Sequence, residues 1–176
     1  MFALLYDPVS EIKKAKKQSY SRILMYLLTA SLFETIGFLF IAWRYFRDSL
    51  TTNLLVSGIF GTLFSLIAVH LVAAFFYSFA MHVLDGKGGY YDGLATLVLA
   101  MVAPAVLTFF AGAALFVPFG LFFAAAMLAY GYVLGAATLF RAGKELFELD
   151  YAGVLVGFLI TAIPLGLSVC LAIFLL

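Results

Sequence analysis

Five long apolar runs separated by short polar breaks make up most of this chain. An α-helix needs roughly 20 residues to cross the hydrocarbon core of a bilayer, and the runs are of about this length or longer. The apolar residues are continuous and do not alternate with period two, which disfavours the strands of a membrane β-barrel. The pattern therefore predicts five transmembrane helices, over residues 23–43, 54–84, 93–110, 116–140 and 151–176.

Composition supports a membrane protein and excludes several other classes. Hydrophobic residues make up 66% of the chain and charged residues 11%, whereas about 25% of a typical soluble domain is charged. The net charge of +1 offers no basic face for a nucleic acid. A single cysteine excludes an internal disulfide. We therefore expect an all-α integral membrane protein, with a leader (residues 1–20) and one five-helix transmembrane domain (residues 21–176).

The distribution of Lys and Arg predicts the orientation, because positive charges near the membrane are retained on the cytoplasmic side. With the N-terminus inside, eight basic residues fall on the cytoplasmic side and only Arg44 and Arg47 on the other. The C-terminus then lies opposite. The first run is too long for a signal peptide and carries Glu34, so we predict a permanent helix. The cytoplasmic set is Lys13, Lys14, Lys16, Lys17, Arg22, Lys87, Arg141 and Lys144.

The leader is basic and amphipathic. Asp7 suits a helix N-cap and Pro8 the first helical position, while Val9 and Ile12 fall on one side. The pattern predicts a short helix in the membrane interface, with its apolar side in the lipid. Two roles remain open for its lysines: contact with anionic headgroups, or only the setting of orientation. These lysines are Lys13, Lys14, Lys16 and Lys17.

Two ionisable residues fall near the middle of predicted membrane helices, where polar groups are costly and often functional. Glu34 lies in the first helix and His70 in the second, so antiparallel packing would place them at similar depth. Such a pair could relay a proton or bind a cation. The alternative is structural: Glu34 is neutral or hydrogen-bonded to a neighbour, and His70 caps a polar patch.

Small residues at a spacing of four predict where helices approach closely. Gly131 and Gly135 form one such pair, and Gly153 and Gly157 another. The pairs could join helices of one chain or of two, so a homo-oligomer remains open.

No sequence motif indicates catalysis. The H-E-x-x-H and C-x-x-C patterns of metal sites are absent from the sequence. The stretch "DGKGG" has Gly88 where a phosphate-binding loop needs a hydroxyl, and it follows an apolar helix instead of a strand. We expect no enzyme and no cofactor. The glycines instead predict a tight cytoplasmic turn, with Tyr90 and Tyr91 at the headgroup level.

Residues 84–107, "LDGKGGYYDGLATLVLAMVAPAVL", resemble the central signature of the Yip family, multi-span proteins named for interacting with Ypt/Rab GTPases. In that family a glycine-rich turn followed by an aromatic residue ends the second membrane helix, and a proline lies in the third. The five-helix count, the orientation and the basic stretch after the fourth helix are similar too. The corresponding residues, with the preceding Asp85, are Gly86, Lys87, Gly88, Gly89, Tyr90 and Pro104.

The resemblance implies a non-enzymatic membrane-organising or adaptor protein that contacts lipids and, through its cytoplasmic loops, protein partners. Eukaryotic members bind Rab GTPases, but "LLYDP" (residues 4–8) has Asp7 where their D-L-Y-G-P motif has glycine, and it lacks the leading acid. This departure argues against Rab binding. The compact form resembles prokaryotic members and implies a prokaryotic plasma membrane. The alternative is a small transporter or channel with Glu34 and His70 on its path.

Overall fold

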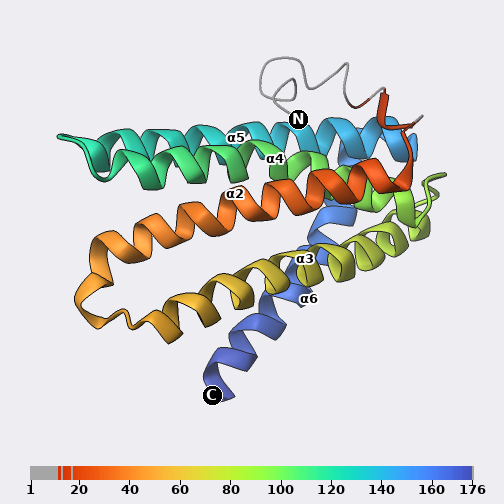
Figure 1. The fold of residues 1–176 in the computed structure, drawn as a ribbon. Coiled ribbons are helices and arrows are strands. Elements are labelled where there is room, and N and C mark those ends of the chain that lie inside the picture. Colours follow the sequence, from red (N-terminus) through yellow and green to blue (C-terminus); the bar gives the residue numbers. More distant parts are fainter. Residues whose placement is uncertain (1–11, 13, 17, 176) are drawn as a thin grey trace.

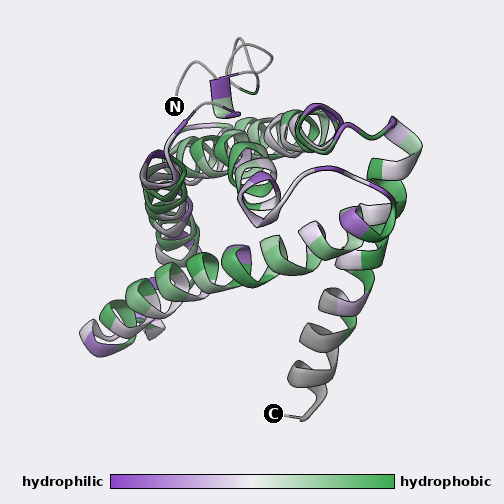
Figure 2. Ribbon diagram, turned by 90° about the vertical axis from the view of Figure 1, so that its right-hand side faces the viewer, coloured by the Kyte–Doolittle hydropathy of each residue, from purple (hydrophilic) through white to green (hydrophobic). Residues whose placement is uncertain are grey.

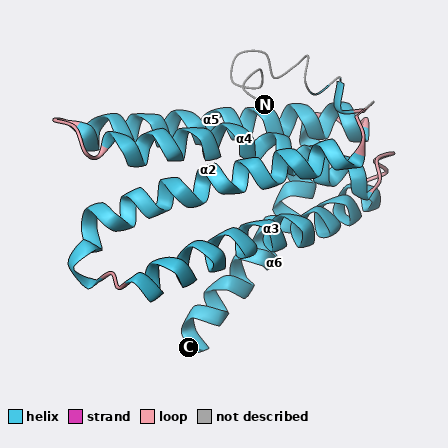
Figure 3. Cartoon of the chain, viewed as in Figure 1, coloured by secondary structure: helices cyan, strands magenta, loops and turns pink. Residues whose placement is uncertain are grey.

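The computed structural model describes residues 12, 14–16 and 18–175, without the side chains of 165 and 168–175. This part of the chain is helical, with short connections and no strand (Figures 1 and 3). The all-α prediction is confirmed. The helices are α2 (Tyr20–Phe46), the single 3₁₀ turn η2 (Arg47–Ser49), α3 (Thr52–Val83), α4 (Tyr90–Ala114), α5 (Gly120–Phe147) and α6 (Tyr151–Leu175).

Four of the described helices are long and apolar enough to cross a membrane, namely α2 with its short 3₁₀ extension, α3, α4 and α5. In α6, the apolar stretch Tyr151–Pro164 is shorter than a span. The four long helices support a multi-pass membrane protein, and a fifth span stays a prediction.

The fourth predicted helix ends too early in the sequence-based prediction. It was expected to end at residue 140, but α5 continues to Phe147. Ala142 and Leu146 are buried, so the apolar side of the helix continues through this segment. Arg141 and Glu145 lie one turn apart on the more exposed side and form an ion pair of 3.1 Å. The basic stretch expected between helices is therefore largely helical.

The centre of the fold is α4, which packs along α2 and along α5 (Figure 1). A Cβ atom at Gly112 would come within 2.6 Å of the backbone oxygen of Gly37, so α2 and α4 touch backbone to backbone there. The buried side chains of α4 form much of the core, and the largest fully buried ones are Leu94, Val98, Leu99, Val102 and Val106.

At one end of the molecule α3 and α6 lie against the other helices, and toward the opposite end they diverge, whereas α2, α4 and α5 stay packed together. Near its C-terminus α3 packs on α4, where Ala74 and Ser78 face Gly93, whereas Phe60 and Phe64 in its first half are exposed. From its start beside α3, α6 runs away from the other helices (Figures 1 and 2). We call the converging end, with the glycine turn (residues 85–89) and residues 148–150, the turn end. The opposite end holds residues 47–51 and 115–119.

The outer surface of the helices is apolar. Hydrophobic colouring runs along the helices in Figure 2, and hydrophilic colouring gathers near the connections. Phe79 is 64% exposed and Phe122 is 73% exposed. Apolar surface of this extent needs a cover other than water, and for four helices of membrane-spanning length that cover is lipid.

Candidate functional site

The turn end brings together three segments that are far apart in the sequence. The backbone N–H of Lys87 in the glycine turn donates a hydrogen bond of 2.9 Å to the carbonyl oxygen of Phe147, the last residue of α5. Gly88 lies against the ring of Phe147, which is fully buried. The α3–α4 connection is thereby fixed to the α5–α6 connection.

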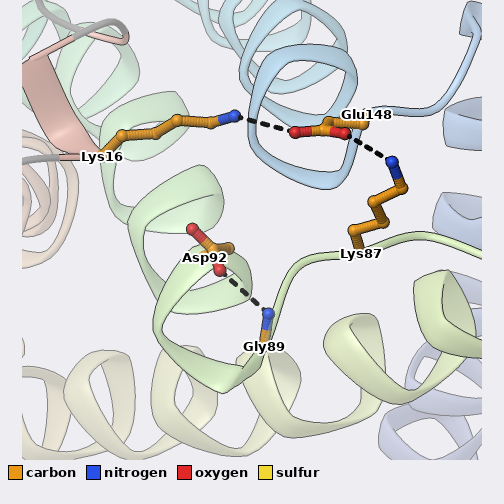
Figure 4. Close-up of polar contacts among 5 residues, drawn as sticks. All are labelled: Lys16, Lys87, Gly89, Asp92 and Glu148. Atoms are coloured by element: carbon orange, nitrogen blue, oxygen red, sulfur yellow. Dashed lines mark hydrogen bonds and ion pairs between the residues drawn. The ribbon is translucent and has the colours of Figure 1, made fainter.

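Glu148 lies between two lysines, as Figure 4 shows. Its Oε2 is 3.1 Å from the Lys87 Nζ, and its Oε1 is 3.5 Å from the Lys16 Nζ. The hydrogen bond and charge of Lys87, followed by those of Lys16, hold the pKa of the Glu148 carboxyl below its usual value. All three side chains are exposed to a large extent, so each pair contributes little stability. Together the pairs align the leader, the glycine turn and the end of α5.

The described part of the leader packs onto the protein. Ile12 and Ala15 are buried in the core cluster. The Tyr91 hydroxyl donates a hydrogen bond shared by the backbone oxygens of Ala15 and Gln18, each at 2.9 Å. Its ring lies 6.1 Å from that of Tyr20, between centroids. The apolar side of the leader was predicted to face the lipid, but Ile12 packs against the apolar core of the protein instead.

Of the four leader lysines proposed to contact headgroups, the structure describes two. The side chains of Lys14 and Lys16 are exposed. Lys13 and Lys17 lie outside the described residues, as does the predicted helix start at Asp7 and Pro8.

The glycines of the turn do not adopt unusual backbone angles, and Gly86 and Gly88 allow close packing of the turn against neighbouring segments. None of the described glycines has a positive φ, and Asp85 takes the left-handed conformation at φ 64°. A Cβ atom at Gly86 would come within 2.8 Å of a backbone oxygen of α3. At Gly89 there is open space, and its N–H donates a 2.9 Å hydrogen bond to the Asp92 carboxylate that closes the start of α4 (Figure 4). A turn is present where the glycines predict it, but its left-handed residue is Asp85 and not a glycine.

Tyr90, the aromatic residue of the signature, points toward α3. Its hydroxyl donates a hydrogen bond of 3.2 Å to the backbone oxygen of Leu71, and its side chain is 37% exposed. The two tyrosines that follow the glycine turn therefore fasten different partners, α3 and the leader.

Glu34 lies on the buried side of α2, with Ser31 and Thr35 beside it. Within the described part of the chain, the hydroxyls of Ser31, Thr35 and Thr108 of α4 have no hydrogen-bond partner. Glu34, Ser31, Thr35 and Thr108 thus form a group of buried polar side chains in an apolar bundle.

His70 has a hydrogen-bond partner within its own helix. Its Nδ1 lies 2.8 Å from the backbone oxygen of Leu66, one turn earlier in α3. Among the described residues, no hydrogen bond or ion pair joins the His70 imidazole to the Glu34 carboxyl. The structure gives no direct contact for the relay hypothesis.

The first glycine pair lies between α5 and α4. A Cβ atom at Gly135 would come within 2.7 Å of the Pro104 Cγ and 2.8 Å of the Ala100 backbone oxygen. At Gly131 it would come within 3.1 Å of the Leu107 Cβ. Both positions thus lie at a contact within one chain.

The two glycines of the second pair, Gly153 and Gly157, have different neighbours. Gly157 of α6 faces α3, where a Cβ atom would come within 2.7 Å of the Met81 sulfur. Gly153 faces only the two residues that precede α6, and a Cβ atom there would lie 3.1 Å from the Asp150 carboxylate oxygen. That carboxylate accepts a 2.7 Å hydrogen bond from the Gly153 N–H.

At the turn end, the sequence did not indicate the role of Glu148, and it indicated a different role for Tyr91. Glu148 is one of several charged residues near a helix end, and nothing in its neighbourhood indicates a partner at Lys87. Tyr91 was assigned to the headgroup level because aromatic residues beside a turn commonly lie there. The separation of 76 residues between Tyr91 and Ala15 leaves no local pattern to detect.

The described residues contain no group of three or more His, Cys, Asp or Glu side chains that could hold a metal ion. Comparison of the chain with protein-family models, curated proteins and solved structures found no match.

Proposed function

We propose that this chain is a non-enzymatic membrane-organising protein and a compact, prokaryotic-type member of the Yip family, with its turn end in the cytoplasm. The observation that carries this proposal is the divergence of α3 and α6 from the packed helices α2, α4 and α5 with distance from the turn end (Figure 1). The glycine turn "GKGGY", which supports the family assignment, lies at the point of convergence.

A protein of this shape takes up more area in one leaflet than in the other. The leaflet at the splayed end must expand around it, and the membrane relieves this difference by curving convex toward that end. The turn end then forms a polar face on the concave side. The largely exposed side chains of Lys16, Lys87 and Glu148 lie on this face, where the lysines can exchange their pairing for anionic headgroups and all three can meet a charged protein partner.

Reconstitution tests the proposal. Purified protein is inserted into vesicles of phosphatidylethanolamine and phosphatidylglycerol at increasing protein-to-lipid ratios, and vesicle diameters are measured by electron cryomicroscopy. We expect diameters to fall, or tubules to form, as protein density rises, relative to vesicles taken through the same procedure without protein. Unchanged diameters at every density would contradict a membrane-shaping role.

The alternative function is a small transporter or channel, and the buried polar group around Glu34 favours it. Proton and cation flux is measured in the same vesicles, with the wild type, Glu34→Gln and His70→Gln. Flux that Glu34→Gln abolishes would establish transport. If His70→Gln leaves that flux unchanged, the path uses Glu34 without His70, as the absence of a contact between them in the described residues leads us to expect. No flux with any tested cation would contradict this alternative.

A further inference from the structure

The splay of α2 from α3 leaves a groove at the opposite end of the molecule. Its volume is about 470 Å³, which lies within the usual range for ligand pockets. Its walls come from α2, α3 and the α4–α5 connection, and they are almost wholly apolar. The lining residues are Leu39, Phe40, Trp43, Leu55, Ile59 and Phe116.

A second pocket, of about 370 Å³, adjoins the groove and is far more polar. Trp43 and Phe116 line both, so the apolar groove and the polar pocket are continuous. The pocket adds Arg44 and Arg47, which are three residues apart where α2 ends and which both line it. Leu115 and Val117 complete it.

The two arginines leave positive charge available at this pocket. Among the described residues, Arg44 takes part in no ion pair. Arg47 pairs at 3.4 Å with Asp48, but these side chains are 70% and 93% exposed, so water competes strongly for the pair. Asp48 offsets one charge, and the pocket keeps a net positive charge.

We propose that this site binds one anionic phospholipid, with an acyl chain in the groove and the phosphate on the guanidinium groups of Arg44 and Arg47. Guanidinium groups bind phosphate through paired charge-assisted hydrogen bonds. Trp43 and Tyr45 at the end of α2 are typical of the headgroup level, which is where a lipid phosphate lies. The inference rests on the proposed membrane location, and it holds for the organiser and the transporter alike.

Trp43 provides a direct test, because it is the only tryptophan in the chain. Bromine atoms on an acyl chain quench tryptophan fluorescence at short range. Detergent-solubilised protein is titrated with brominated phosphatidylglycerol and, separately, with brominated phosphatidylcholine of the same chain length. We expect half-maximal quenching by phosphatidylglycerol at a several-fold lower concentration. Equal quenching by both lipids would overturn the proposal, whatever the outcome of the vesicle-shape and flux measurements.

Variants separate the headgroup contact from the chain contact. Arg44→Gln with Arg47→Gln should abolish the preference for phosphatidylglycerol and leave quenching by phosphatidylcholine unchanged, which also shows that the variant is folded. The matched control is Arg22→Gln, an exposed arginine at the turn end, which should keep the preference. Ile59→Phe narrows the groove and should weaken quenching by both lipids. A preference that survives the double arginine variant would overturn the assignment.

Two further measurements distinguish other occupants. Millimolar inorganic phosphate should leave quenching by phosphatidylglycerol unchanged, and displacement of the lipid by phosphate alone would identify a free-anion site instead. With brominated lipid in large excess over protein, quenching should also be independent of protein concentration. Quenching that weakens as protein concentration rises would show that a second copy of the chain fills the groove, and would overturn the lipid assignment.

Discussion

Gly88 lies so close to the ring of Phe147 that a Cβ atom at residue 88 would come within 2.6 Å of the ring carbon Cδ1. The preceding residue, Lys87, donates its backbone N–H to the Phe147 carbonyl oxygen at 2.9 Å. The Phe147 ring also meets the Tyr77 ring edge to face, with centroids 5.7 Å apart. The glycine turn is therefore seated on the buried end of α5, and the lack of a side chain at residue 88 is a packing requirement.

Gly88→Ser should destabilise the protein by about 1–3 kcal/mol, because the new side chain must displace a buried ring or shift the turn. Gly89→Ser is the matched control, since a Cβ atom there meets nothing within 4 Å and serine suits the N-cap position of α4. Thermal unfolding in detergent micelles measures both. Equal losses of stability in the two variants would contradict the packing account.

The lowered pKa of Glu148 predicts a pH dependence. The pKa of a glutamate in an unfolded chain is about 4.3, and the pKa of the Glu148 carboxyl in the folded protein is lower. Its contribution to stability is therefore fully present above the unfolded pKa and is lost as pH falls through the folded pKa. The stability difference between the wild type and Glu148→Gln should shrink below about pH 4.

A variant cycle identifies the source of this effect. In a background of Lys16→Gln and Lys87→Gln, the Glu148→Gln change should have no pH-dependent effect on the unfolding temperature, because both partners are gone. A pH-dependent difference that persists in this background would assign the lowered pKa to another cause.

The α4–α5 contact predicts different outcomes for two glycines in helices. Gly135→Ala should cost about 1–3 kcal/mol, because its Cβ would press on the Pro104 ring and on a backbone oxygen of α4. A Cβ atom at Gly58 of α3 has no neighbouring atom within 4 Å. Gly58→Ala should therefore stabilise the protein by about 0.5–1 kcal/mol, because alanine has a higher helix propensity than glycine. Unfolding in a denaturing detergent measures both. A loss at Gly58 as large as at Gly135 would reveal an unobserved partner for α3.

The leader is predicted to loosen when the Tyr91 hydroxyl is removed. Tyr91→Phe deletes the hydrogen bond to the backbone oxygens of Ala15 and Gln18, with an expected loss of about 1 kcal/mol. Limited trypsin digestion of the solubilised protein should then cut faster at the leader lysines. Tyr132→Phe, an exposed tyrosine on α5, is the control and should leave the cleavage rate unchanged. Equal rates in both variants would show that the hydroxyl does not hold the leader.

The helices were predictable because runs of apolar residues of membrane length leave few other possibilities. Which side of each helix faces protein was not predictable, since lipid-facing and buried residues are both apolar. Phe64 is 68% exposed and Val98 is fully buried, yet hydropathy does not separate them. The pairing of Glu34 with His70 was inferred from depth alone. Contact also depends on helix rotation, which places Glu34 on the buried side of α2, and on the splay of α3.

The partners at the turn end were beyond prediction for a different reason. The contacts of Lys87 with Glu148, and of Tyr91 with Ala15, join segments that come together only after the helices have packed. Single charges and single tyrosines beside a turn are common in membrane proteins, and no local pattern marks the ones that have a distant partner.

The central place of α4 also sets an order of assembly during synthesis. The contact with α2 can form as soon as α4 has been made, since α2 and α3 precede it in the chain. Its other side, including Pro104 and Ala100, stays open to lipid until α5 has been translated and Gly135 can close onto it. The Lys87–Phe147 hydrogen bond can form only when α5 is complete. The glycine turn therefore becomes fixed only after residues some sixty positions later have been synthesised.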